Sequence, residues 1–260
     1  MIHLRYQALL ITGAILCTVS TVGAGDLGVL NARLRKYLDL RRAEFDQIPV
    51  ERKEALQQVS QYICRSLASG DPARLTFICT HNSRRSHMGQ LWALASAAYY
   101  EVGNVETFSG GTEATAFNPR AVAAMERAGF EAVKGAESTN PKYQVRLGAE
   151  YPAQICFSKV YYAEPNPKKD YCAIMTCAQA DKSCPMVRGA SVRVSVPYDD
   201  PKSADGTAAE TATYDERCAQ IARETLYIFS LVNNQNDGQN GSDKLAGKGG
   251  GRCQTPSNKP

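Results

Sequence analysis

Apolar residues in this chain follow two alternating patterns, one typical of buried strands and the other of helices. Residues 75–78 form a compact apolar run, and from Ser86 onward the apolar side chains recur at helical spacing. The same alternation predicts strands at 105–109, 171–177 and 191–196, and helices at 118–129 and from Tyr214 onward. Strands that alternate with helices indicate an α/β fold, with a parallel sheet and helices on both faces.

The segment before this alternation, residues 25–72, carries two helical patterns separated by Ile48-Pro49. Each pattern has an apolar stripe on one face, formed by Leu27, Leu30, Leu34 and Leu38 in the first and by Leu56, Val59, Ile63 and Leu67 in the second. We expect an N-terminal helical hairpin that caps the sheet or binds a partner. The α/β domain then covers residues 73–234.

Two other segments depart from the alternation. Residues 143–147 and 155–162 are both strand-like, and a turn rich in proline and lysine follows them, so we expect an inserted β-hairpin. Residues 235–260 are rich in Asn, Gly, Lys and Ser and contain almost no apolar side chains. This composition predicts a disordered tail.

Residues 1–24 have the layout of a secretory signal peptide. An apolar run from Ala8 to Val19 follows a short basic start, and small residues end the segment at Ala24. An uncleaved membrane anchor is the alternative, although the apolar run is short for a membrane span. Either form places the rest of the chain outside the cytoplasm, periplasmic or membrane-anchored. A cytoplasmic protein with a buried N-terminal helix is the other interpretation.

Composition narrows the chemistry further. The 260 residues carry a net charge of +4 without a basic stripe interleaved with aromatic residues, so we expect no nucleic-acid partner. Nine cysteines accompany only three histidines, which supplies mixed Cys/His zinc sites poorly. The cysteines therefore indicate nucleophilic or redox chemistry, and we expect neither a metal nor a cofactor.

The junction between the first strand and the helix after it carries the candidate chemistry. Residues 79–86 read Cys-Thr-His-Asn-Ser-Arg-Arg-Ser. A loop that passes from a strand into a helix directs backbone N–H groups and the positive end of the helix dipole at one point, which favours an anion. A thiol at its mouth would be held as thiolate by these groups and by Arg85. We expect Cys79 to be a nucleophile beside a tetrahedral oxyanion.

This loop resembles the phosphate-binding loop of the low-molecular-weight protein tyrosine phosphatases and of the thioredoxin-coupled arsenate reductases that share their fold. The resemblance rests on Cys79, five intervening residues, Arg85 and Ser86, with Asn82 inside the loop. The run Phe-Ser-Gly-Gly-Thr-Glu at 108–113, followed by Phe-Asn-Pro-Arg-Ala-Val at 117–122, resembles the next strand and helix of that family. The implied fold has three layers around a four-stranded parallel sheet.

The resemblance also implies roles for individual residues. Ser86 would donate a hydrogen bond to the thiolate, Asn82 would hold the tight loop backbone, and Asp200, favoured over Asp199, would be the acid that protonates the departing oxygen. Arg84 stands where the reductases usually carry another cysteine. The oxyanion would be held by the loop residues Thr80, His81, Asn82, Ser83, Arg84 and Ser86, with His81 at the rim.

A second pair of thiols favours the reductases. Cys177 and Cys184 follow the third predicted strand with six residues between them, and this segment resembles the redox segment of the thioredoxin-coupled arsenate reductases. The resemblance implies that Cys79 forms an adduct with arsenate and that Cys177 attacks it, releasing arsenite. Cys184 would then take over the disulfide, and a thioredoxin-like reductant would reduce it.

Two other functions remain open from the sequence. The chain could be a low-molecular-weight tyrosine phosphatase that hydrolyses phosphotyrosine or another phosphate ester, with Cys177 and Cys184 as a structural or protective disulfide. It could also be a non-catalytic oxyanion-binding module that uses the N-terminal helices for interaction. An export signal fits poorly with a cytoplasmic detoxification enzyme.

Overall fold

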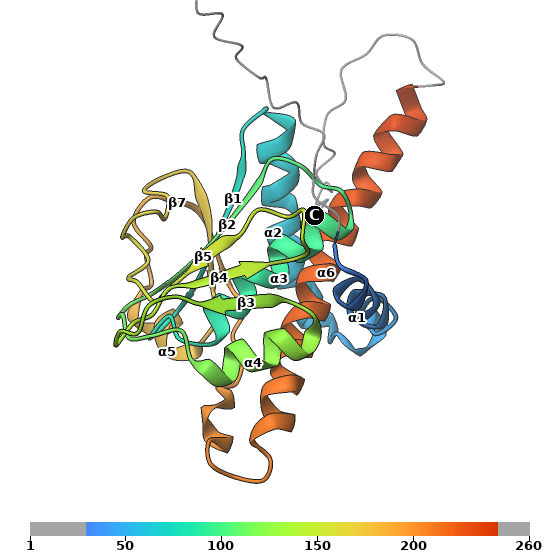
Figure 1. Ribbon diagram of the computed structural model, residues 1–260. Helices are drawn as coiled ribbons and strands as arrows, with labels where there is room; N and C mark the ends of the chain where they lie inside the picture. Colours follow the sequence, from blue (N-terminus) through green and yellow to red (C-terminus); the bar gives the residue numbers. More distant parts are fainter. Residues whose placement is uncertain (1–29, 244–260) are drawn as a thin grey trace, which may run out of the picture.

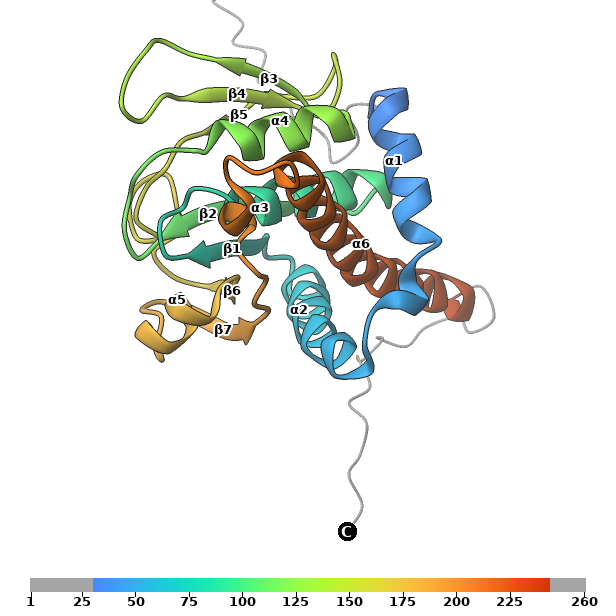
Figure 2. The ribbon, with the colours of Figure 1, turned by 90° about the horizontal axis from the view of Figure 1, so that it is seen from below.

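The computed structural model describes the backbone of residues 30–243 and the side chains of residues 30–235. Its centre is a four-stranded parallel sheet (Figure 1), and the strands follow the order β2-β1-β6-β7 (Figure 2). The expected parallel sheet is therefore confirmed. Its strands are β1 (Ala73–Cys79), β2 (Val105–Gly111), β6 (Tyr171–Met175) and β7 (Ala190–Ser195). Because all four strands point the same way, the segments that follow them meet at one edge of the sheet.

Alternate residues of the strands supply two apolar layers. Phe77 joins the large core beneath the helices, whereas its neighbour Ile78 joins a smaller cluster with Tyr171 and Met175 on the other face. The large core is covered by α2 (Val50–Ala68), α3 (Arg85–Tyr99) and α6 (Glu210–Asp243) (Figure 2). The smaller cluster is covered by the short helix α5 (Ala178–Ser183) and the irregular segment 157–170.

Two helix boundaries follow from the sequence as predicted. Helix α4 (Pro119–Ala128) begins after Asn118, whose side chain accepts a hydrogen bond from the Arg120 amide, and ends at Gly129 with a φ of 118°.

Helix α3 packs closely on the sheet because Gly89 lacks a side chain. A Cβ at that position would lie 2.4 Å from the Phe77 ring.

The N-terminal hairpin is part of the main core. Helix α1 (Ala32–Arg42) leads through a short 3-10 helix (Phe45–Gln47) into α2. Leu34 and Leu38 of α1 are fully buried, and α1 contacts α6, α3 and α4. Arg52 of α2 also pairs with the buried Glu224 of α6 at 2.9 Å. These two helices therefore complete the layer over one face of the sheet.

The inserted hairpin is present and carries one more strand than the sequence predicted. Strands β3 (Glu131–Lys134), β4 (Tyr143–Arg146) and β5 (Gln154–Cys156) form an antiparallel sheet in that order. The prediction that the last strand runs to residue 162 is wrong. After Cys156 the chain turns towards the loop at 79–85, so that Ser158 and Lys159 bond to that loop instead of a neighbouring strand.

Helix α6 is longer than the sequence predicted. It begins at Glu210 and its backbone stays helical to Asp243, so the prediction of disorder is wrong for residues 235–243. Once a helix has formed, each further residue that joins it is ordered in exchange for one hydrogen bond. The buried turns of α6 are the formed part from which the helix extends. The signal-like segment 1–24 and residues 244–260 lie outside the described residues. Among the described helices, none combines the length and apolarity that a membrane crossing requires.

Candidate active site

The loop after β1 presents its amides inward. The carbonyl oxygens of Cys79, Thr80, His81 and Ser83 all accept hydrogen bonds from segments outside the loop, at 2.8 to 3.1 Å. In a trans peptide the N–H points away from the C=O, so the amides of residues 80, 81, 82 and 84 face the interior of the loop. Gly111 allows the close approach, because a Cβ there would lie 2.7 Å from the Asn82 nitrogen. The result is a concave set of N–H donors for an anion.

Asn82 holds the shape of this loop. It is fully buried and has a φ of 44°, a left-handed conformation that asparagine tolerates better than most residues. Its Oδ1 accepts a hydrogen bond from the Lys159 amide at 2.9 Å, and its Nδ2 donates to Ser86 Oγ at 2.9 Å. Ser86 Oγ lies 3.1 Å from Cys79 Sγ. Since Ser86 accepts from Asn82, its hydroxyl hydrogen is left to donate to the sulfur.

Arg85 connects the loop to the segment after β7. Its Nη1 donates to the Tyr198 carbonyl at 2.9 Å and its Nη2 to Asp200 Oδ2 at 2.7 Å. Its Nε is buried and has no hydrogen-bond partner among the described residues. A cleft of about 500 Å³ lies here, and its lining includes Arg85, Tyr198, Asp200, Cys177 and Gln179. A buried donor without a partner is costly, so this Nε is available for an oxyanion.

The remaining candidate residues have different places. The Arg84 side chain points to α6, where its Nε donates to the Tyr214 hydroxyl at 2.7 Å, so Arg84 can offer an anion its amide but not its guanidinium. The His81 side chain is half exposed at the rim, 3.6 Å from Glu113. Asp199 is 98% exposed, whereas Asp200 is the carboxylate that meets Arg85.

The second thiol lies against this loop. Cys177 is buried, and its Sγ is 3.4 Å from the hydroxyl of Thr80, the residue after Cys79. It also caps the N-terminus of α5, because its Sγ accepts a hydrogen bond from the Ala180 amide at 3.3 Å. Cys184 is partly buried at the opposite end of the same helix. The described residues contain no cluster of metal-ligating side chains.

Sequence reasoning missed Lys159, which lies beneath the loop. Its side chain is 94% buried and its Nζ lies 4.9 Å from the centre of the Phe157 ring. Burial lowers the pKa of Lys159 to about 8. The only signal in the sequence was a lysine inside an otherwise apolar segment, and a strand with one solvated face gives the same pattern.

We expect the substitution Lys159→Met to remove a pH dependence of stability. The pKa of Lys159 falls from 10.5 to about 8 on folding. At this residue the unfolded chain therefore binds more protons between these values, and the contribution of Lys159 to the free energy of unfolding rises with pH across that window. This contribution is at most roughly 3 kcal/mol. Urea unfolding of parent and variant at pH 7 and pH 10 measures it as the difference between their pH dependences, and an equal pH dependence in the two chains would contradict it.

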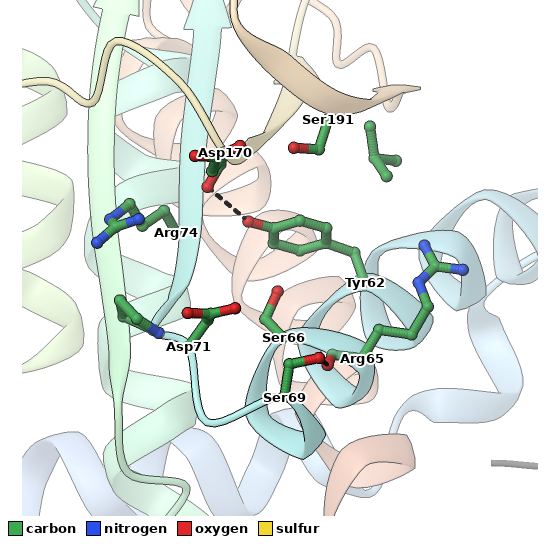
Figure 3. Close-up of a pocket in the computed structure, with 10 residues that line it drawn as sticks. Tyr62, Arg65, Ser66, Ser69, Asp71, Arg74, Asp170 and Ser191 are labelled. Carbon is green, nitrogen blue, oxygen red and sulfur yellow. Dashed lines mark hydrogen bonds between the residues drawn. The ribbon is translucent and has the colours of Figure 1, made fainter. Parts of the chain in front are cut away.

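A second cleft, of about 410 Å³, lies at the opposite end of the sheet (Figure 3). The Tyr62 hydroxyl at its centre donates to the Asp170 carbonyl at 3.1 Å, and Arg65 and Arg74 lie on either side of this tyrosine. No cysteine or histidine lines this cleft. This cleft therefore offers no thiol, in contrast to the site after β1.

A cysteine and an arginine around inward-facing amides, at the carboxyl edge of a parallel sheet, define the class of cysteine-based oxyanion enzymes. The comparisons with known proteins agree. The chain is 30% identical over 154 residues to an arsenate reductase from Bacillus licheniformis, a match that covers 59% of this chain and 92% of that protein. The chain therefore belongs to the family of this arsenate reductase and is an enzyme.

Solved structures show weaker likeness. A low-molecular-weight phosphotyrosine phosphatase from Vibrio cholerae is 11% identical, with a TM-score of 0.44, over 63% of this chain and 98% of its own. A thioredoxin-dependent arsenate reductase from Corynebacterium glutamicum is 17% identical, with a TM-score of 0.36, over 75% of this chain and 85% of its own. No protein-family model matches the chain. The assignment rests on the sequence relative and on the site.

Proposed function

We propose that this enzyme reduces arsenate to arsenite. The observation that carries the proposal is the position of Cys177, whose sulfur contacts the hydroxyl of Thr80, next to the candidate nucleophile Cys79. Hydrolysis of a phosphate ester requires one thiol, whereas reduction requires a second thiol to supply electrons. The relative from Bacillus licheniformis, an arsenate reductase by name, supports the same choice.

The proposed reaction uses the two thiols in order. The Cys79 thiolate attacks arsenic and displaces one oxygen as water, while the loop amides and Arg85 hold the remaining oxygens. Cys177 then attacks the sulfur of Cys79, and the sulfur–arsenic bond breaks with its electron pair on arsenic. Arsenic gains two electrons and leaves as arsenite, and the two sulfurs lose two electrons to become a disulfide.

Cys184 completes the proposed cycle by taking over this disulfide from Cys79. It lies at the C-terminal end of α5, six helical residues beyond Cys177. Exchange of the disulfide frees Cys79 and leaves a Cys177–Cys184 pair, which a thioredoxin-like partner would reduce. We further propose, from the signal-like segment 1–24, that the enzyme is exported or membrane-anchored and that this partner shares its compartment.

A side-by-side assay of the purified chain tests the proposal. Arsenite production is measured with arsenate, thioredoxin, thioredoxin reductase and NADPH, and hydrolysis is measured with p-nitrophenyl phosphate. We expect sustained arsenite release that depends on thioredoxin. Hydrolysis of the aryl phosphate without any arsenite release would instead favour the phosphatase function.

A tyrosine phosphatase is the second candidate, and one contact favours it. Asp200 lies 2.7 Å from Arg85, where its carboxyl group could protonate a departing phenol. In that function Cys79 would form a phosphoenzyme and Cys177 and Cys184 would be structural or protective. A non-catalytic binding module is not proposed, because the chain belongs to a family of enzymes and places Cys79 in an amide-lined loop.

A further inference from the structure

An arginine of β7 holds the C-terminal end of α5, the helix between Cys177 and Cys184, by hydrogen bonds. Arg193 of β7 donates from Nε to the Cys184 carbonyl at 3.1 Å and from Nη2 to the Asp181 carbonyl at 2.8 Å. The same Nη2 reaches Asp181 Oδ1 at 2.5 Å, and Ser195 donates to Asp181 Oδ2 at 2.9 Å. We call these four contacts the α5 clamp.

The clamp satisfies carbonyl groups that the helix itself leaves open. Helix α5 has six residues, so its last carbonyls have no partner within the helix. A helix this short is marginal in isolation, and a cation near its C-terminus stabilises it. The Arg193 guanidinium supplies both the charge and two fixed donors, which a lysine could not reproduce in the same geometry.

The intact helix keeps the two thiols apart. Cys177 and Cys184 are its N-cap and C-cap, seven positions from each other. At 1.5 Å per residue their Cα atoms lie about 10 Å apart, whereas a disulfide needs about 4.4 to 6.8 Å. The bond between them therefore requires α5 to open at one end, and the clamp holds the C-terminal end closed.

We propose that Arg193 is a positioning residue that sets the redox equilibrium of the Cys177–Cys184 pair by stabilising the dithiol form. This inference rests on the proposed function, in which that pair receives the electrons of the reductant. The clamp contacts are lost when α5 opens, so they oppose disulfide formation and favour reduction. Without the clamp the pair would oxidise more readily and return to the dithiol less readily.

The test measures that equilibrium without arsenate. The full chain carrying Cys79→Ser is equilibrated with mixtures of glutathione and glutathione disulfide. The pair gives two electrons and two protons to glutathione disulfide, which becomes two thiols. Acid quenching, alkylation and peptide mass spectrometry give the fraction of Cys177–Cys184 disulfide. With Arg193→Gln we expect the equilibrium constant for oxidation to rise about tenfold, equivalent to a potential about 30 mV more negative.

Companion variants separate the clamp from a general loss of stability. Asp181→Asn removes the charge that faces Arg193 and should shift the equilibrium in the same direction by a smaller factor. Arg193→Lys should behave like Arg193→Gln if the fork geometry matters. Arg74→Gln is the matched control, since it removes an arginine–carboxylate pair of 2.9 Å from β1 at the far end of the sheet, and should change nothing.

Three results would overturn the proposal. They are an equilibrium in Arg193→Gln within twofold of the parent, an equal shift in Arg74→Gln, and the absence of a Cys177–Cys184 disulfide in parent and variant alike. None of these measurements needs arsenate turnover. A failure of arsenate reduction and a failure of the clamp are therefore distinguishable.

Discussion

Cys79→Ser is expected to abolish arsenate reduction and aryl phosphate hydrolysis together, each by at least about 10,000-fold. A serine hydroxyl in the same loop stays protonated at neutral pH, and among the described residues the side chain that hydrogen-bonds at this position is the Ser86 hydroxyl, which is not a base. Loss of both activities from one substitution would show that they share a nucleophile. The measurement is initial rate with each substrate at saturating concentration.

Anion binding provides the control for this variant. The inward-facing amides and Arg85 do not depend on the sulfur, so the Cys79→Ser chain should still bind phosphate and arsenate. Isothermal titration should give dissociation constants within about tenfold of the parent. If the variant kept either activity at more than one hundredth of the parental rate, Cys79 would not be the nucleophile.

Cys177→Ser should separate the two candidate functions. Without a second thiol beside the loop, the arsenic adduct cannot be reduced, and arsenite release should fall below detection. Hydrolysis of p-nitrophenyl phosphate should remain within about threefold of the parent, because the Cys79 loop stays intact. A serine hydroxyl at 177 can also keep the N-cap of α5.

Cys184→Ser is the informative partner of that substitution. In the proposed order the disulfide between Cys79 and Cys177 forms before Cys184 acts. Cys184→Ser should therefore release one arsenite per enzyme in a burst and then stop, whereas Cys177→Ser should release none. Sustained arsenate turnover by Cys177→Ser would rule out the proposed relay.

The sequence predicted the parts of the fold that local patterns determine. The apolar run of β1, the helical spacing of α3, and the cap residues Asn118 and Gly129 are local signals, and the structure confirms them. The sequence did not predict strand β3 because it has no buried face. Three of its four residues are exposed and only Ala132 is partly buried, so no alternating apolar pattern marks it. Its pairing with β4 supplies the order that its own pattern lacks.

The candidate site shows the same division. Cys79, Ser86 and Asn82 lie close together in the chain, so one loop brings them together. The contact of Cys177 with Thr80 joins the segments that follow β6 and β1, and the contact of Arg193 with Asp181 joins β7 to α5. The sequence also did not predict the direction of the Arg84 side chain, which faces Tyr214 and not the interior of the loop. Such contacts depend on the order of strands in the sheet, which spacing along the chain does not encode.

Helices α1 and α2 decide where this chain can be divided. Leu34 and Leu38 are covered completely by the rest of the protein, and Arg52 neutralises a carboxylate inside it. A fragment that starts at β1 would lose this cover and leave Glu224 as an unmatched interior charge. We therefore expect the smallest stably folded fragment of this enzyme to include α1 and α2.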